Sequence, residues 1–408
     1  MTPNLLRDFL HARLPFTLDL LRRMVAINSH TLNPAGVNAV GRVTAEAFAP
    51  LGFVAEFIRS VHPAHGDHLV LTRRGTGPDV VGMISHLDTV FTAEEEERND
   101  FRWHEEGDRI YGPGTEDIKG GTVMIHLLLE ALQRHAPELF ARTTWMVLLD
   151  ASEEMNSEDF GRLCLERLRG ARAALVFEAG RRVGNRWQVV TARKGRATFR
   201  FDVEGRGAHA GSDHARGANA VVQVAHLVQQ AAALTDPARD RTVNIGRLSG
   251  GGALNRVPHE AWAEGEIRAF DRTAYADGLA RLRALEQEIV VRAVADGLPC
   301  RVRFTLLSET PPWPPNPGTE KLFQCWATAG AALGMVIERE ERGGLSDGNH
   351  ISHAVPTLDG LGPEGDNAHC SERSADGSKD QEYLVVSSLV PKTELNFHAL
   401  RRLLESES

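Results

Sequence analysis

Histidine and carboxylate side chains follow several short apolar runs of this sequence. His86 comes after "DVVGMIS", Glu153 and Glu154 come shortly after "TTWMVLLD", and Glu178 follows "AALVF". Asp117 lies in the glycine-rich segment "YGPGTEDIKGG". Imidazole nitrogens and carboxylate oxygens are ligands that divalent cations take in proteins. If these groups meet in the folded chain, they predict a metal site.

The apolar runs before these residues are typical of central strands in a mainly parallel sheet, because such strands are buried on both faces. Helical patterns lie between them, one from Lys119 ("KGGTVMIHLLLEALQRH") and one from Ser157 ("SEDFGRLCLERLRG") that stops at Gly170. Alternating strands and helices predict an α/β layer fold. Ligands bind beyond the carboxyl ends of the strands in such sheets, so we expect these side chains at one sheet edge.

Several carboxylates at one sheet edge would repel one another, and this repulsion would raise their pKa values. Two dications would offset the repulsion, so we expect two metal ions. Metals about 3.5–4 Å apart can activate a bridging water and polarise a carbonyl together.

Each of these signals alone also has an ordinary structural interpretation. His86 would be a polar strand end, Asp117 a helix N-cap, and "SEEMNSED" a solvated acidic turn. Glu178 is harder to explain in this way, because an acid at a sheet edge is costly to bury without a partner. "GRGAHA" from Gly205 matches a dinucleotide-binding pattern, but the strand before it alternates, and no acidic residue clearly ends a second buried strand. The sequence has neither a GxSxG elbow nor a Walker loop.

The pattern changes near Arg193, where "ATFRFDVEG" alternates apolar and polar residues as a half-exposed antiparallel strand does. A helix "ANAVVQVAHLVQQAAAL", strands "TVNIGRLSGG" and "AWAEGEIRAF", a long helix "YADGLARLRALEQEIVVRAVADG" and a strand "RVRFTLL" follow. This β-α-β-β-α-β order predicts a smaller, ferredoxin-like α+β domain inserted at 195–307. The proline-rich "SETPPWPPNPG" leads back to a metal-binding domain that comprises 1–194 and 308–408.

Composition limits the class of protein. A chain of 408 residues is expected to form two domains, and its net charge of -9 argues against nucleic acid or an anionic membrane as a partner. Four scattered cysteines favour a reducing compartment. The first residues form an amphipathic helix pattern that Pro15 is expected to break, without the apolar region of a signal peptide. No apolar stretch is long enough to span a bilayer, so we expect a cytoplasmic protein.

The motifs together carry a family resemblance. "SHLDTVF", "YGPGTEDIKGG", "DASEE" and "FEAG", followed by "VEGRGAHAG", "NIGRLSGGGALNRVP", "GEIRAF" and "GGLSDGNHISHAVPTLDGLGPEGDNAHCSERS", resemble the M20 family of di-zinc peptidases and amidohydrolases. That family includes glutamate carboxypeptidase, acetylornithine deacetylase, succinyl-diaminopimelate desuccinylase and aminoacylase. The resemblance covers nearly the whole chain. It implies zinc-dependent hydrolysis of an amide or peptide bond, with two Zn²⁺ per subunit, or Co²⁺ or Mn²⁺ in their place.

The resemblance also implies a role for each of the expected ligands. His86 and Glu178 correspond to ligands of one zinc, Glu154 and His369 to ligands of the other, and Asp117 to the carboxylate that bridges both.

Three histidines compete for the last position, His350, His353 and His369. His369 is preferred because "DNAHCSE" follows "VPTLDGLGP", where the family places its final histidine, and His350 in "SDGNH" is the alternative. Glu153 resembles the general base that takes a proton from water. Asp88 resembles the carboxylate that holds the His86 ring, and a ligating histidine usually donates its other N–H to such a group.

The insert is expected to act as a dimerisation and lid domain. His209 resembles the histidine that reaches the partner subunit's active site and holds the oxyanion there. Asn255 and Arg268 resemble residues that bind the polar end of the substrate, and Arg268 would favour a free α-carboxylate. These parallels imply a homodimer formed through the insert.

The substrate is expected to be a small peptide or an N-acyl amino acid. "SDGN" and "LDGLGP" are closest to the glutamate carboxypeptidase branch, which favours release of a C-terminal amino acid, glutamate among them. Deacylation of an N-acyl amino acid is the alternative within the family. A relative that binds metal or peptide without turnover is the alternative of another class.

Overall fold

The computed structural model describes residues 3–405 and divides into two compact units. The larger unit comprises Met1–Thr191, Pro315–Glu341 and Ser346–Ser408, and the smaller unit comprises Ala192–Pro314 and Arg342–Leu345.

The unit boundaries differ from the expected 195–307 at the carboxyl end of the insert. The last strand of the smaller unit continues to Thr310, and Lys194 N–H donates to the Arg342 carbonyl at 3.1 Å. The Arg193 guanidinium also donates to the carbonyls of Gly344 and Leu345. These bonds place the short return segment Arg342–Leu345 in the smaller unit.

A six-stranded sheet forms the centre of the larger unit. Its spatial order is β1 (Val54–Arg59), β2 (Asp67–Arg73), β6 (Thr144–Asp150), β3 (Val80–His86), β7 (Ala173–Val176) and β15 (Thr357–Leu358). The pairs β6–β3, β3–β7 and β7–β15 are parallel, whereas β1 and β2 add antiparallel strands at one side. The expected α/β fold with a mainly parallel sheet is therefore confirmed.

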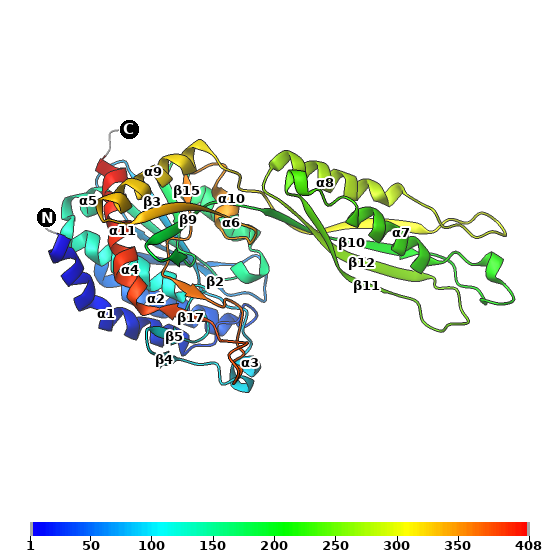
Figure 1. Ribbon diagram of the computed structural model, residues 1–408, viewed down its shortest axis with the longest axis horizontal. Helices are drawn as coiled ribbons and strands as arrows, with labels where there is room; N and C mark the ends of the chain where they lie inside the picture. The colour runs from blue at the N-terminus through cyan, green and yellow to red at the C-terminus, as the bar shows by residue number, and fades with distance from the viewer. Residues whose placement is uncertain (1–2, 406–408) are drawn as a thin grey trace. The chain divides into compact units, whose positions relative to one another are not determined.

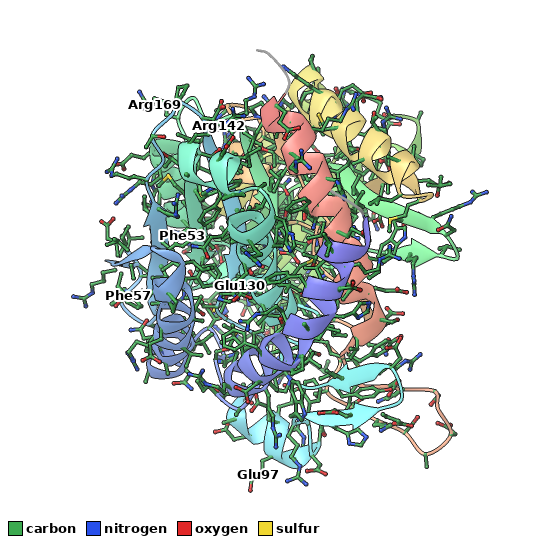
Figure 2. The ribbon with its side chains drawn as sticks, turned by 90° about the vertical axis from the view of Figure 1, so that its left-hand side faces the viewer. Phe53, Phe57, Glu97, Glu130, Arg142 and Arg169 are labelled. Carbon is green, nitrogen blue, oxygen red and sulfur yellow. The ribbon has the colours of Figure 1, made fainter. Side chains whose placement is uncertain are left out.

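Helices cover both faces of this sheet, which explains the nearly continuous apolar runs of its central strands. One face packs on α1 (Pro3–Val25), α2 (Pro34–Phe48), α4 (Lys119–His135), α9 (Pro317–Ala332) and α11 (Val386–Glu405). The other face packs on α6 (Glu158–Arg167) and α10 (Gly348–Ile351), both labelled in Figure 1. Figure 2 faces the first layer, where Glu130 of α4 accepts hydrogen bonds of 3.0 and 2.6 Å from Arg13 of α1.

The expected helix break at Pro15 is wrong, because α1 continues through it from Pro3 to Val25. Leu6 and Leu10 before the proline and Leu20, Leu21 and Met24 after it are all buried in the same core. Burial of this apolar stripe outweighs the loss of one backbone hydrogen bond at the proline.

Shorter elements complete the larger unit. Two small sheets have the orders β16–β17–β5–β4 and β14–β9–β8. Their strands are β4 (His104–Glu106), β5 (Arg109–Tyr111), β8 (Arg182–Val183), β9 (Arg186–Arg193), β14 (Val336–Arg342), β16 (Gly365–Asp366) and β17 (Tyr383–Val385). The short helices are η1 (Ala49–Leu51), α3 (Ala93–Arg98), α5 (Pro137–Arg142) and η2 (Glu153–Met155).

The smaller unit is an antiparallel four-stranded sheet of order β11–β12–β10–β13 with two helices against it. Its main elements in chain order are β10 (Gly195–Glu204), α7 (Ala220–Ala232), β11 (Thr242–Gly250), β12 (Glu260–Ala269), α8 (Arg272–Ala284) and β13 (Arg301–Thr310). Short helical turns η3 (His214–Arg216), η4 (Pro237–Arg239) and η5 (Leu285–Gln287) lie between them. The β-α-β-β-α-β order is the one read from the sequence.

The long helix expected through Gly297 is wrong, because α8 ends at Ala284. The backbone N–H groups of Val290 and Val291 donate to the side-chain oxygen of Gln223 at 2.9 and 3.0 Å. Amides that bind a side chain of another helix are not available for helical hydrogen bonds. None of the helices within residues 3–405 combines the length and apolar composition that crossing a bilayer requires.

Candidate functional site

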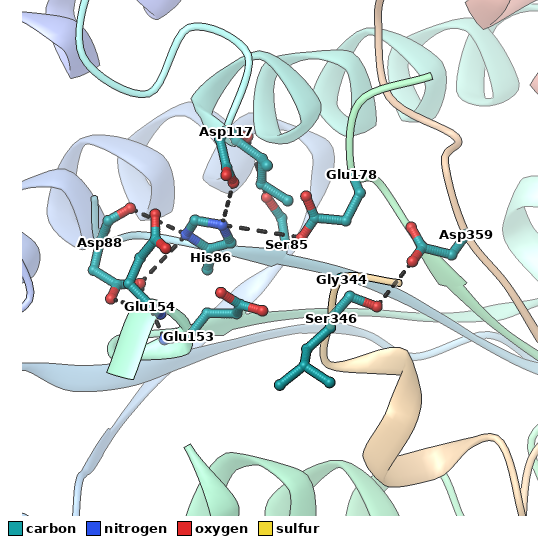
Figure 3. A network of polar contacts seen from close by, with 12 residues as sticks. Ser85, His86, Asp88, Asp117, Glu153, Glu154, Glu178, Gly344, Ser346 and Asp359 are labelled. Atoms are coloured by element: carbon teal, nitrogen blue, oxygen red, sulfur yellow. Dashed lines mark hydrogen bonds and ion pairs between the residues drawn. The ribbon is translucent and has the colours of Figure 1, made fainter. Parts of the chain in front are cut away.

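The carboxyl ends of three neighbouring strands of the large sheet carry the expected site residues. His86 is the last residue of β3, and it lies opposite Asp150, the last residue of β6. Glu153 and Glu154 follow in η2, and Glu178 comes soon after β7. Figure 3 shows these side chains converging with Asp117, from the turn before α4.

One group of possible metal ligands consists of His86, Asp117 and Glu178, whose ligand atoms lie within 4.8 Å of one another. His86 Nε2 is 2.9 Å from Asp117 Oδ1 and 4.0 Å from Glu178 Oε1. The imidazole is buried, so water does not compete for its ring nitrogens.

A second group consists of Asp117, Glu154 and His369. His369 Nε2 lies 3.2 Å from Asp117 Oδ2 and 3.1 Å from Glu154 Oε2. Asp117 thus belongs to both groups and turns one carboxylate oxygen to each histidine. A carboxylate in this position can bridge two cations.

His350, the alternative last ligand, lies elsewhere. It belongs to α10 and packs against Gly161 of α6, so closely that a side-chain carbon on that glycine would lie 2.7 Å from its Cβ. Burial lowers the pKa of His350, which favours a neutral ring. Neither group of possible ligands among residues 3–405 includes it.

Charge in the two groups is strongly coupled. Burial disfavours a positive charge on His86, but hydrogen bonds with Asp117 and Asp88 outweigh it and raise the pKa of this histidine well above its usual value. Hydrogen bonds to Asp117 and Glu154 raise the pKa of His369 to about 11. Two imidazolium ions therefore supply positive charge where metal cations would displace their protons.

The raised pKa values of the two glutamates favour their neutral forms. Burial, and then the negative charge of Asp117, raises the pKa of Glu154 to about 7. Burial also raises the pKa of Glu153 well above its usual value. Removing these groups from water disfavours their charged forms, and bound dications would favour them again.

Asp88 has a wider structural role than holding one ring. The Nδ1 atom of His86 lies 3.0 Å from the Asp88 carbonyl oxygen and 3.3 Å from its Oδ1. The Asp88 carboxylate accepts the backbone N–H groups of Glu153 and Glu154 at 3.2 and 3.3 Å, and the hydroxyl of Thr31 at 2.6 Å. One buried carboxylate thus orients His86 and the turn that carries both glutamates.

Sequence reasoning missed Glu382, which is fully buried beside the site. Its Oε1 accepts the backbone N–H groups of Glu116 and Asp117 at 2.9 and 3.2 Å, and so fixes the turn before α4. Burial, with the charge of Asp117, raises the pKa of Glu382 to about 8. No spacing marks this residue in the sequence, because its role depends on β17 pairing with β5.

His209, Asn255 and Arg268 belong to the smaller unit. His209 is exposed, and its Nδ1 accepts the backbone N–H groups of Gly211 and Ser212 at 3.1 and 3.0 Å. The carbonyl of Asn255 accepts the N–H of Ala210, which places Asn255 beside the His209 loop.

Arg268 is engaged within its own unit. Its Nε and Nη2 donate to the two carboxylate oxygens of Glu266 at 2.8 and 3.1 Å, and Nη1 donates to the Gly343 carbonyl at 2.9 Å. Glu266 therefore occupies the edge of the guanidinium that carries Nε and Nη2. The sequence alone did not indicate this ion pair.

Comparisons of the sequence with known proteins identify its family. A model of the peptidase family M20/M25/M40 matches residues 82–389. Carboxypeptidase G2 of Pseudomonas sp. (strain RS-16) is 27% identical over 92% of this chain and 86% of its own length. Succinyl-diaminopimelate desuccinylase of Sphingopyxis alaskensis is 26% identical over 84% of this chain and 89% of its own length.

The fold also resembles that of a solved structure. A Bacillus subtilis dinuclear metal-binding peptidase from family M20, YXEP, superposes with a TM-score of 0.67 at 14% identity, covering 97% of this chain and 100% of its own. This likeness concerns the fold, whereas the family model and the curated relatives concern the sequence itself. The expected resemblance is confirmed, and the chain belongs to the metal-dependent peptidases and amidohydrolases of family M20/M25/M40.

Proposed function

We propose that this chain is a di-zinc hydrolase that cleaves the amide bond before a C-terminal amino acid, with glutamate conjugates as its first candidate substrates. The position of Asp117 carries the proposal. Its two carboxylate oxygens face His86 and His369 at 2.9 and 3.2 Å, so that two ligand groups share one carboxylate.

The donor set fits two divalent cations. His86 with Glu178 would hold one, Glu154 with His369 the other, and Asp117 both, so each cation would receive imidazole nitrogen and carboxylate oxygen, the ligands that zinc takes in catalytic sites. When bound, the cations polarise the scissile carbonyl and lower the pKa of an attacking water.

Glu153 is the proposed general base. It is in neither ligand group, yet Asp88 holds its backbone beside them through the 3.2 Å hydrogen bond. A half-buried carboxylate in this place would take the proton of the attacking water and deliver it to the leaving amine.

His209 is the proposed donor to the oxyanion. Because its Nδ1 accepts two backbone N–H groups, the neutral ring carries its proton on Nε2 and can donate from that atom. We propose that it acts in the site of a second copy within a homodimer.

Asn255 and Arg268 are proposed to bind the polar end of the substrate. The bonds to Glu266 and Gly343 use three of the five N–H groups of the Arg268 guanidinium, which leaves two for a substrate carboxylate.

A substrate panel tests the proposed function. Purified protein with Zn²⁺ is offered N-acylated peptides ending in glutamate, the same peptides ending in other amino acids, and N-acetyl and N-succinyl amino acids. Preference for release of a C-terminal amino acid supports the proposal, in line with the similarity to carboxypeptidase G2. Preference for deacylation favours the alternative that the similarity to a desuccinylase raises. Absence of turnover on the whole panel would contradict both.

Mixing two inactive variants tests whether His209 acts across a dimer. We expect E153Q and H209A homodimers to be almost inactive. A mixed dimer would have one complete site, with Glu153 from one subunit and His209 from the other, so subunit exchange should restore activity. No recovery in demonstrated mixed dimers would contradict action across the dimer.

A further inference from the structure

His68 lies buried in β2 between two aspartates that mark the ends of the 150–159 segment. Its Nδ1 is 3.1 Å from Asp150 Oδ1, and its Nε2 is 3.1 Å from Asp159 Oδ2. Asp150 ends β6, and Asp159 lies in the first turn of α6. One imidazole therefore joins the beginning and the end of the segment that carries the proposed base and one proposed ligand.

Asp150 depends on this ring for charge compensation. Its Oδ1 accepts the backbone N–H of Ser152 at 2.9 Å, a bond that shapes the turn leading to Glu153. Its Oδ2 is buried and has no hydrogen-bond partner within residues 3–405. A buried carboxylate needs a compensating charge, and the His68 ring is the group in contact with it.

Asp159 anchors the other end of the segment. Its Oδ2 accepts the hydroxyl of Ser60 at 3.0 Å and the N–H of Val61 at 2.9 Å besides facing His68, and its Oδ1 accepts the hydroxyl of Ser157 at 3.2 Å. Through these bonds α6 is tied to the strand that carries His68 and to the loop that precedes it.

The charge of the ring decides which contacts it makes. Both nitrogens donate only when the ring is protonated. Burial opposes that charge, but hydrogen bonds with Asp150 and Asp159 outweigh it and raise the pKa of His68 to about 9. Nδ1 also lies 3.2 Å from the backbone nitrogen of Ala151, whose N–H a neutral ring would accept. Phe160 of α6 covers the ring at 5.2 Å between centroids.

We propose that His68, held between Asp150 and Asp159, is a positioning residue that fixes the 150–159 segment and thereby sets Glu154 as a metal ligand. Asp88 holds the same segment from the side of the metal site, through the N–H groups of Glu153 and Glu154. The segment is thus fixed from two sides, and His68 supplies the attachment farther from the metals. The part that concerns Glu154 as a ligand rests on the proposed function.

Stepwise metal binding tests this inference in the purified, metal-stripped protein. In H68Q the amide side chain cannot carry the charge that Asp150 requires, so the segment shifts. We expect one of two Co²⁺ sites to weaken about 10–100-fold, the usual cost of losing a group behind a metal ligand, while the site of His86 and Glu178 keeps its affinity. Isothermal titration with Co²⁺ measures both steps.

H104Q is the matched control, because His104 is exposed on β4 and its loss should leave both steps unchanged. A folded H68Q protein that binds two Co²⁺ ions as tightly as the wild type would overturn the inference. If H68Q does not fold, D159N decides, since it removes one of the two links and should weaken the same single site. Two unchanged affinities in D159N would overturn the inference as well.

The outcomes separate this inference from the proposed function. A wild type that binds two metals but cleaves nothing on the substrate panel contradicts the function, while the titration of H68Q still tests the positioning role.

Discussion

Charged side chains form two clusters in this protein, and the two clusters differ in how far their carboxylates are buried. At the sheet edge of the larger unit, Glu154 is 6% exposed beside the half-buried Asp117, and its pKa is raised to about 7, mainly by burial. On the sheet of the smaller unit, Arg200 is 27% exposed and donates to Asp202 and Glu264 at 2.8 Å each.

The difference shows which cluster needs positive charge that the chain itself does not supply. Arg200 and its two acids largely neutralise one another in contact with water, and the hydrogen bond to Asp202 raises the pKa of the arginine. The sheet edge holds more acids than histidines, and the Glu154 side chain is only 6% exposed, so its own residues leave negative charge uncompensated. Added cations would offset that imbalance, which supports the proposal that this cluster is the functional one.

The largest expected effect comes from Glu153, the acid proposed to transfer the proton. E153Q should lower kcat by about 10²–10⁴-fold, because an amide cannot accept the proton. Metal content, measured by elemental analysis of the same preparation, should remain at two ions. Full activity with both metals bound would show that another group is the base.

Removing His369, a proposed metal ligand, should have the next largest effect. H369A is expected to retain one tightly bound metal instead of two, since Asp117 and Glu154 alone hold the second ion weakly. H353A is the control, because His353 belongs to neither ligand group within residues 3–405. Metal content after dialysis gives the result, and an unchanged count in H369A would remove His369 from the ligand set.

The buried ion pairs of His68 should make stability depend on pH. The pKa of this histidine is raised to about 9 in the folded protein, from 6.5 in the unfolded chain. Its contribution, about 3 kcal/mol from this difference, is complete below pH 6.5 and is lost as the pH rises through 9. The difference in unfolding free energy between wild type and H68Q, measured in urea, should therefore shrink from pH 6 to pH 10. A constant difference would mean that the ring is neutral throughout.

The half-buried cluster of Arg200, Asp202 and Glu264 should respond least. R200A removes ion pairs that remain in contact with solvent, which contribute below about 1 kcal/mol to stability. Metal affinity should not change at all. If R200A altered metal binding by calorimetry, the contrast between the two clusters would be wrong.

Much of the fold could be predicted from the sequence, because it depends on local patterns of apolar and polar residues. The buried strands β3, which ends at His86, and β7, which ends at Val176 shortly before Glu178, give apolar runs, and the helix starting at Lys119 has clear apolar periodicity. The five residues expected as ligands lie together in the structure. The predicted helix break at Pro15 was wrong, because the tertiary packing of α1 outweighs the tendency of proline to end a helix.

The residues that support the site could not be read in the same way. Thr31, His68 and Glu382 each act through a partner distant in sequence, Asp88, Asp159 and the turn before α4, respectively. No spacing rule connects such pairs, because only the folded sheet brings them within hydrogen-bond distance. The same holds for Val290, whose amide bonds to Gln223 and not to a helix.

The parallel pairing of β3 with β6 and β7 has a consequence for the order of assembly. The proposed ligands come from segments that are far apart in sequence and adjacent only once these strands have paired. An unfolded or nascent chain therefore offers no preformed chelate, and metal captured by the folded chain adds its binding free energy directly to stability. Loading is expected to be the final step of maturation, and withdrawal of metal the first step towards unfolding.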